Sequence, residues 1–308
     1  MIPEAMWLEV VHVMRAVTAI LLTVAQTAPR RSVFDYDREA PLVIEELSSK
    51  TDEGITVSDI TFAGPRGGRV PAWLVEPSGS GPFGAIVFMH MGGSDRNEFL
   101  NEAKAQAHRG IVSILINAPY LRPDPPPTLK DDKRARAESD LDMYTTLVID
   151  LRRAIDVLID RPNVDPELIG YVGHSLGAAW GSALAGFERR IKAFVLIAGS
   201  SRPGQISGED WYSKIMQSVV GDQPEQIAHY EEVISAISPH RFLPHAVPGS
   251  ILFQFGLNDE KVSRDRAEEM IAVAGPSHEV RWYGTDHGFG HPQATEDRIE
   301  WLSRRLKP

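Results

Sequence analysis

Residues 168–177 read LIGYVGHSLG, and residues 178–186 read AAWGSALAG. The first five residues form a short apolar run that favours a buried strand, and the small residues of the second stretch favour a helix. Ser175 therefore stands on the turn between a strand and a helix, with Gly173 and Gly177 two positions away on either side. Such a turn is too tight for side chains at these neighbouring positions, and it presents the serine hydroxyl to a ligand. The stretch indicates a nucleophilic serine; a plain strand-to-helix turn is the alternative interpretation.

Nearly continuous apolar runs precede and follow this stretch, with helical stretches between them. Such runs fit strands that are buried on both faces, as the strands of a parallel sheet are. We expect strands at residues 85–89, 111–116, 168–172, 193–198, 250–255 and 279–283, and helices at residues 97–108, 137–160, 178–189, 264–274 and 295–306. This alternation predicts an α/β fold with a mostly parallel central sheet and helices on both faces. Ahead of it, residues 55–62 and 69–76 flank a glycine-rich turn and predict an antiparallel hairpin.

The strand, the GHSLG turn and the helix resemble the nucleophile region of the α/β-hydrolase fold. More narrowly, the chain is similar to bacterial esterases of the dienelactone hydrolase-like and acyl-peptidase-like groups, over about residues 50–308. This resemblance implies a catalytic serine, acid and histidine that follow one another in this order along the chain. Dienelactone hydrolases usually carry cysteine where this chain has Ser175, so their own activity is not implied.

The resemblance also implies the two partners of the serine. Residues 256–262 read GLNDEKV, which is similar to the Gly-x-x-Asp-x-x-Val loop of the family, so Asp259 would orient the imidazole. Residues 284–290 read GTDHGFG and follow the last expected strand, so His287 would be the general base. The rivals are the next carboxylate and a histidine four residues further on, Glu260 and His291.

An oxyanion hole needs two N–H donors. One is implied at Leu176, the residue after the nucleophile. The other should come from residues 88–94, which read FMHMGGS and resemble the His-Gly-Gly motif of the family with Met91 in place of the first glycine. We expect Gly92 to be this donor and Met91 to be the alternative. We interpret His90 as a hydrogen-bonded structural residue rather than as a catalytic one.

Residues 201–245 do not fit the alternation of strands and helices and predict a small helical cap. The chain between Ser175 and Asp259 is longer than one strand–helix unit requires, so we expect the cap to stand over the serine. A proline-rich loop at residues 119–127 would form the opposite wall. The aromatic and methionine side chains would line the substrate pocket or form the core of the cap itself: Trp211, Tyr212, Met216 and Tyr230 from the cap, and Tyr120 from the loop.

The composition excludes several classes of protein. The chain has 308 residues and a formal net charge of −10 without a basic cluster, which disfavours a nucleic-acid partner. It has no cysteine, which excludes disulfides, a thiolate nucleophile and cysteine-bound metals. A metal site at residues 286–291 is disfavoured because that loop has no helix to align its imidazoles. We expect neither a metal nor another cofactor.

Residues 1–49 are expected to be an N-terminal helical segment ahead of a catalytic domain at residues 50–308. The uncharged stretch at residues 16–28 is too short to span a membrane. It favours helices docked on this protein or on a second copy, which would give a homodimer. The alternative is a secretory signal peptide that starts at Met14. A retained segment favours the cytoplasm, whereas a cleaved one means export.

Together these observations predict a serine carboxylesterase that hydrolyses short-acyl carboxylic esters through an acyl-enzyme intermediate. A serine peptidase or a hydrolase of amides or thioesters would use the same residues. A ligand-binding protein that has lost catalysis is the alternative from another class, and the ordered serine, acid and histidine disfavour it.

Overall fold

A computed structural model describes residues 32–123 and 135–307. The chain divides into two units, Met1–Asp35 and Tyr36–Pro308, and the sheet with its helices belongs to the second. The expectations of docked N-terminal helices and of a signal peptide fall outside the described residues, as does part of the proline-rich loop. Among the described residues, no helix is both long and apolar enough to cross a membrane.

A single mixed sheet organises the second unit. In the described part of the chain it has nine strands in the order β1-β2-β3-β5-β4-β6-β7-β8-β9. The strands β5, β4, β6, β7, β8 and β9 run parallel to one another, while β1, β2 and β3 form an antiparallel edge. The strands are β1 (Glu45–Asp52), β2 (Ile55–Ala63), β3 (Arg69–Pro77), β4 (Phe83–Met89), β5 (Ile111–Ile116), β6 (Val164–His174), β7 (Ile191–Ile197), β8 (Ile251–Gly256) and β9 (Glu279–Tyr283).

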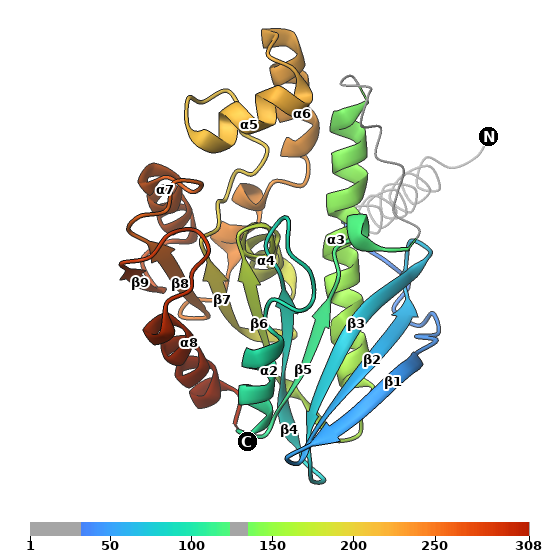
Figure 1. The fold of residues 1–308 in the computed structure, drawn as a ribbon. Coiled ribbons are helices and arrows are strands. Elements are labelled where there is room, and N and C mark those ends of the chain that lie inside the picture. Colours follow the sequence, from blue (N-terminus) through green and yellow to red (C-terminus); the bar gives the residue numbers. More distant parts are fainter. Residues whose placement is uncertain (1–31, 124–134, 308) are drawn as a thin grey trace, which may run out of the picture. The chain divides into compact units, whose positions relative to one another are not determined.

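Helices cover both faces of this sheet, as the alternating pattern predicts. Figure 1 shows α2 and α8 on one face and α3 and α4 on the other, with α5 and α6 standing beyond the ends of the parallel strands. These two helices are the expected cap. The helices are α2 (Leu100–Ala107), α3 (Arg136–Ile159), α4 (Leu176–Phe187), α5 (Trp211–Val220), α6 (Pro224–Ser235), α7 (Arg264–Ala274) and α8 (Pro292–Arg305), with short 3₁₀ turns η1 (Pro119–Leu121), η2 (Pro239–Arg241) and η3 (Leu243–His245).

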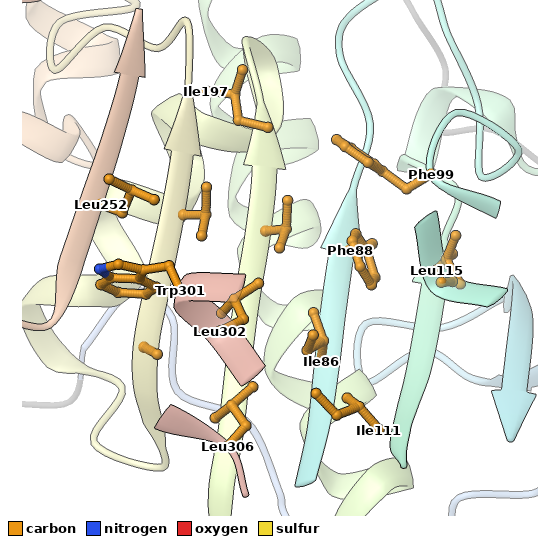
Figure 2. Packing of buried hydrophobic residues seen from close by; sticks show 14 of the residues in the cluster. Ile86, Phe88, Phe99, Ile111, Leu115, Ile197, Leu252, Trp301, Leu302 and Leu306 are labelled. Carbon is orange, nitrogen blue, oxygen red and sulfur yellow. The ribbon is translucent and has the colours of Figure 1, made fainter. Parts of the chain in front are cut away.

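The core between the sheet and the α2/α8 face is continuous and apolar. Trp301 and Leu302 of α8 pack over the parallel strands, and Leu306 packs near the start of β4, beside Gly84 (Figure 2). Each fully buried side chain of this size contributes about 1.5–3 kcal/mol relative to an exposed one. This packing fixes the strands that end at the site.

The first strand differs from the sequence-based expectation. Residues 45–49, expected in the N-terminal helical segment, form the first five residues of β1, so the sheet begins before residue 50. All eight residues of β1 are exposed, and the strand pairs with β2 alone. An exposed polar edge strand has no apolar face, and periodicity therefore cannot reveal it.

A buried ion pair joins the two helices of the α2/α8 face. The Nε and Nη2 atoms of Arg298 lie 2.9 and 2.6 Å from Oε2 of Glu102. Both side chains are under 10 % exposed. Removing one member leaves the other charge buried without its partner.

We predict that Arg298→Ala lowers the free energy of unfolding by about 3–5 kcal/mol, because it leaves the Glu102 carboxylate buried without its partner. Urea unfolding followed by circular dichroism measures this. Arg304→Ala, which breaks the exposed pair with Glu300, is the control and should cost less than about 1 kcal/mol. Equal losses in the two variants would contradict the role of the buried pair.

Candidate active site

The turn between β6 and α4 holds Ser175 in a strained conformation. Its φ is +51° and its ψ is −102°, in a region that non-glycine residues rarely adopt. A Cβ on Gly173 would lie 2.4 Å from the carbonyl carbon of Gly177, and a Cβ on Gly177 would lie 2.3 Å from the carbonyl oxygen of Met89. The two glycines are therefore required by close backbone packing, which maintains the strain at the serine.

The structure brings together the three side chains that the sequence selected. Nε2 of His287 lies 2.8 Å from Oγ of Ser175, and Nδ1 of His287 lies 2.8 Å from Oδ2 of Asp259. The other oxygen of Asp259 accepts the N–H groups of Lys261 and Val262, each at 2.9 Å. Both carboxylate oxygens are thus fixed, and the imidazole is oriented so that it can take the serine proton.

The rival residues lie elsewhere. Glu260 is exposed to solvent, and His291 precedes α8 with its ring centroid 5.3 Å from that of Tyr283. No cluster of three or more potential metal ligands occurs among the residues that the structure describes.

The loop after β4 approaches the serine with its backbone held by side chains. The N–H of Met91 donates to Oε2 of Glu98 at 2.8 Å, so this group is already engaged. The N–H of Ala118 donates to Nε2 of His90, which leaves the proton on Nδ1 to be donated to the carbonyl oxygen of Met91. Burial lowers the pKa of His90, which favours this neutral form. The contacts agree with a structural role for His90.

A cavity of about 220 Å³ opens on Ser175 and His287. Both expected oxyanion donors line it, and the N–H of Leu176 belongs to the first residue of α4, where no preceding turn offers an acceptor. The cap contributes three of the expected pocket residues to its wall: Trp211, Tyr212 and Met216.

Two aromatic residues lie outside this cavity. Tyr120 lines a second cavity of about 230 Å³, which adjoins the first along Gly92, Tyr144 and Leu176. Tyr230 is buried and donates its hydroxyl to Asp140, so it packs the cap onto α3 instead. Trp211, Tyr212 and Met216 thus lie in the cavity wall, whereas Tyr230 lies in the contact between the cap and α3.

Sequence reasoning missed several residues of the cavity wall. Lys261 and Val262 lie two and three residues after Asp259, and their place in the GLNDEKV loop could have indicated them. Arg266 of α7 also lines the cavity, and its guanidinium is held by Asp210 at 2.6 Å, a contact without a local sequence signal.

A second acid–histidine pair lies beside the triad, and sequence reasoning missed it as well. Nδ1 of His174 is 2.6 Å from Oε1 of Glu98, and Nε2 of His174 is 2.8 Å from the carbonyl oxygen of His287. Burial raises the pKa of Glu98, but the hydrogen bond and charge of His174 outweigh burial and hold this pKa below its usual range. The partners are far apart in the sequence, so no local motif could have paired them.

The model of the dienelactone hydrolase family matches residues 70–301. The chain belongs to the dienelactone hydrolase family. The members of this family are hydrolases, and the match confirms the resemblance to dienelactone hydrolase-like proteins that the sequence indicated.

Curated relatives match only part of the chain. The chain is 31% identical over 146 residues to polyketide transferase ATR5 of Stachybotrys chlorohalonatus, which covers 47% of this chain and 45% of that protein. It is 24% identical over 193 residues to the putative hydrolase YtaP of Bacillus subtilis, covering 54% and 60% respectively. The chain spans about half the length of the curated relatives it matches.

Solved structures share the fold over most of the chain. An acetyl xylan esterase from Paenibacillus sp. R4 has a TM-score of 0.70 at 21% identity, covering 87% of this chain and 90% of that one. Acetyl xylan esterase 1 from Thermoanaerobacterium sp. JW/SL YS485 has a TM-score of 0.73 at 18% identity, covering 89% and 92%. These likenesses confirm the α/β-hydrolase fold.

We predict that Gly177→Ala lowers the free energy of unfolding by about 1–3 kcal/mol, because the added methyl group would overlap the carbonyl oxygen of Met89. Urea unfolding measures the loss. Gly284→Ala is the matched control, since its Cβ would meet nothing within 4 Å among the described residues. Equal stability of the two variants would show that the turn between β6 and α4 tolerates a side chain at position 177.

Proposed function

We propose that the chain is a serine carboxylesterase in which Ser175 is the nucleophile, His287 the general base and Asp259 the residue that orients the histidine. The observation that carries the proposal is the unbroken series of hydrogen bonds from Asp259 through His287 to Ser175, which ends in an open cavity. A serine, a base and an oriented acid in contact are the requirements of nucleophilic acyl transfer.

The reaction proceeds in two halves. His287 takes the proton of Ser175 while Oγ attacks the ester carbonyl, and the N–H groups of Gly92 and Leu176 stabilise the oxyanion. His287 then gives the proton to the leaving alcohol, and the acyl group remains on the serine. A water molecule, activated by the same histidine, releases the acid and restores the hydroxyl. Met91 takes no part as a donor, because Glu98 holds its N–H.

The size of the cavity supports short acyl groups as substrates. Its volume of about 220 Å³ is smaller than the range of roughly 300–1,000 Å³ that is typical of sites for drug-sized ligands. Trp211 and Met216 of the cap line it and would hinder long alkyl chains. The structural relatives that are named acetyl xylan esterases act, by their names, on an acetyl group, the shortest common acyl group.

Acyl transfer to an acceptor other than water is the second candidate. Polyketide transferase ATR5 and a rat acyl-coenzyme A amino acid N-acyltransferase are both named transferases and match part of this chain. The same acyl-enzyme would serve both reactions. Adding an alcohol or an amino acid acceptor to an ester assay distinguishes them, because a transferase forms the acylated acceptor in preference to the free acid.

We predict that Ser175→Ala lowers kcat for p-nitrophenyl acetate by about 10⁴- to 10⁶-fold, because the nucleophile is lost while the fold is kept. A fluorophosphonate probe followed by peptide mass spectrometry should label Ser175 of the unchanged protein. Ser218→Ala, an exposed serine on α5, is the control and should still be labelled. Labelling at another residue, or nearly full activity without Ser175, would refute the assignment.

We also predict that esters of four carbons or fewer are hydrolysed with a higher kcat/KM than those of sixteen, because a cavity of about 220 Å³ favours a short acyl chain. Met216→Ala should shift the preference toward chains longer by about two to three carbons, since it opens the cap end of the cavity. A series of p-nitrophenyl esters measures both effects. A higher kcat/KM for the sixteen-carbon ester than for the four-carbon ester would contradict the proposed substrate class.

A further inference from the structure

The ring of His174 lies between two hydrogen-bond acceptors. Its Nδ1 faces a carboxylate oxygen of Glu98 at 2.6 Å, and its Nε2 faces the carbonyl oxygen of His287 at 2.8 Å. A backbone carbonyl can only accept, so Nε2 must carry a proton. A neutral imidazole would then have only a lone pair on Nδ1 to present to the carboxylate.

The short contact with Glu98 therefore requires one proton more than a neutral histidine and a carboxylate possess. The second oxygen of Glu98 accepts the N–H of Met91, as a carboxylate does. The hydrogen bonds with His174 and Met91 keep the pKa of this carboxyl group low in spite of its burial. The pair proposed below has this shared proton on the ring, as an imidazolium of His174 beside a carboxylate of Glu98.

This pair connects the two loops that carry the catalytic groups. Glu98 holds Met91, the residue before the oxyanion donor Gly92, and His174 holds the backbone of His287. His174 itself directly precedes the nucleophile. We propose that Glu98 and His174 are positioning residues that share one proton. With this proton they hold the loop that carries Gly92, here called the oxyanion loop, and the backbone of the catalytic His287 in fixed positions relative to each other. The proposal rests on the proposed esterase function for its catalytic consequence.

The other titratable groups that face the pair are neutral or already paired. The ring centroid of His287 is 5.4 Å from that of His174, and His287 is bound to Asp259. Burial lowers the pKa of His90 and raises that of Tyr120, which favours the uncharged form of each. Ser94, which also bonds to Glu98, and Phe289, whose ring centroid is 6.2 Å from that of His174, complete the surroundings.

Loss of the shared proton at alkaline pH would leave a lone pair of the ring facing either Glu98 or the carbonyl of His287. One of the two loops would lose its anchor, so kcat should fall on the alkaline side of the pH profile. A merely structural contact has no such proton dependence. The conservative variant Glu98→Gln can separate the two cases, because its amide oxygen accepts from Met91 and its amide nitrogen donates to a neutral His174.

The decisive experiment compares kcat for p-nitrophenyl acetate between pH 6 and 10 in the unchanged protein, Glu98→Gln and Glu98→Ala. Glu98→Gln should lose less than about tenfold and should no longer show the alkaline fall. Glu98→Ala should lose about 10²-fold at every pH, in the range seen when an oxyanion donor is displaced. Glu296→Gln, the same change of charge on an exposed residue of α8, is the control and should keep the original profile.

An alkaline fall that persists in Glu98→Gln, or a loss as large as that of Glu98→Ala, would overturn the proposal. A readout without substrate keeps it testable if Glu98→Ala does not fold. Long-range ¹H–¹⁵N spectra of the imidazole rings, with His174→Gln to assign the signal, should show both ring nitrogens of His174 protonated at pH 7 and one protonated in Glu98→Gln. A singly protonated ring in the unchanged protein overturns the pair, whereas a doubly protonated ring in a chain that hydrolyses no ester refutes only the esterase function.

Discussion

The contact of α4 with the end of β4 is the constraint on which the site depends. At Gly177 the first turn of the helix approaches the carbonyl of Met89 so closely that no Cβ fits, and the same approach holds Ser175 at a positive φ. Met89 is the last residue of β4, and the chain reaches Gly92 three residues later. One backbone contact therefore sets both the position of Ser175, the proposed nucleophile, and its distance from the loop that carries Gly92.

The parallel sheet brings the remaining groups to this point. β4, β6, β8 and β9 all end at one edge, and the loops that follow them carry Gly92, Ser175, Asp259 and His287 in turn. Ser175 and His287 are 112 positions apart in the sequence, yet their side chains are hydrogen-bonded. Ligands of open α/β sheets bind at this edge because every crossover places its loop there.

This geometry explains what the sequence could and could not predict. Apolar runs revealed the buried strands, and short motifs selected Ser175, Asp259 and His287, whose side chains the structure brings into contact, because each of these signals lies within a few residues of the chain. β1 has no buried face and left no pattern. The places of Tyr120 and Tyr230 depend on how the cap packs on α3, and the Glu98–His174 pair joins residues from separate strands and loops. Such long-range contacts follow from the assembled fold and not from any local stretch.

The site thus holds two acid–histidine pairs whose different uses follow from what Nε2 of each ring meets. Nε2 of His287 meets a serine hydroxyl, which can donate, so this ring can be neutral and act as a base. Nε2 of His174 meets a carbonyl, which only accepts, so this ring must be a donor there. An unpaired imidazolium 5.4 Å from His287 would oppose the positive charge that the base acquires during catalysis. In the proposed pair the carboxylate of Glu98 cancels that charge, which is a physical reason for an acid at this partly buried position.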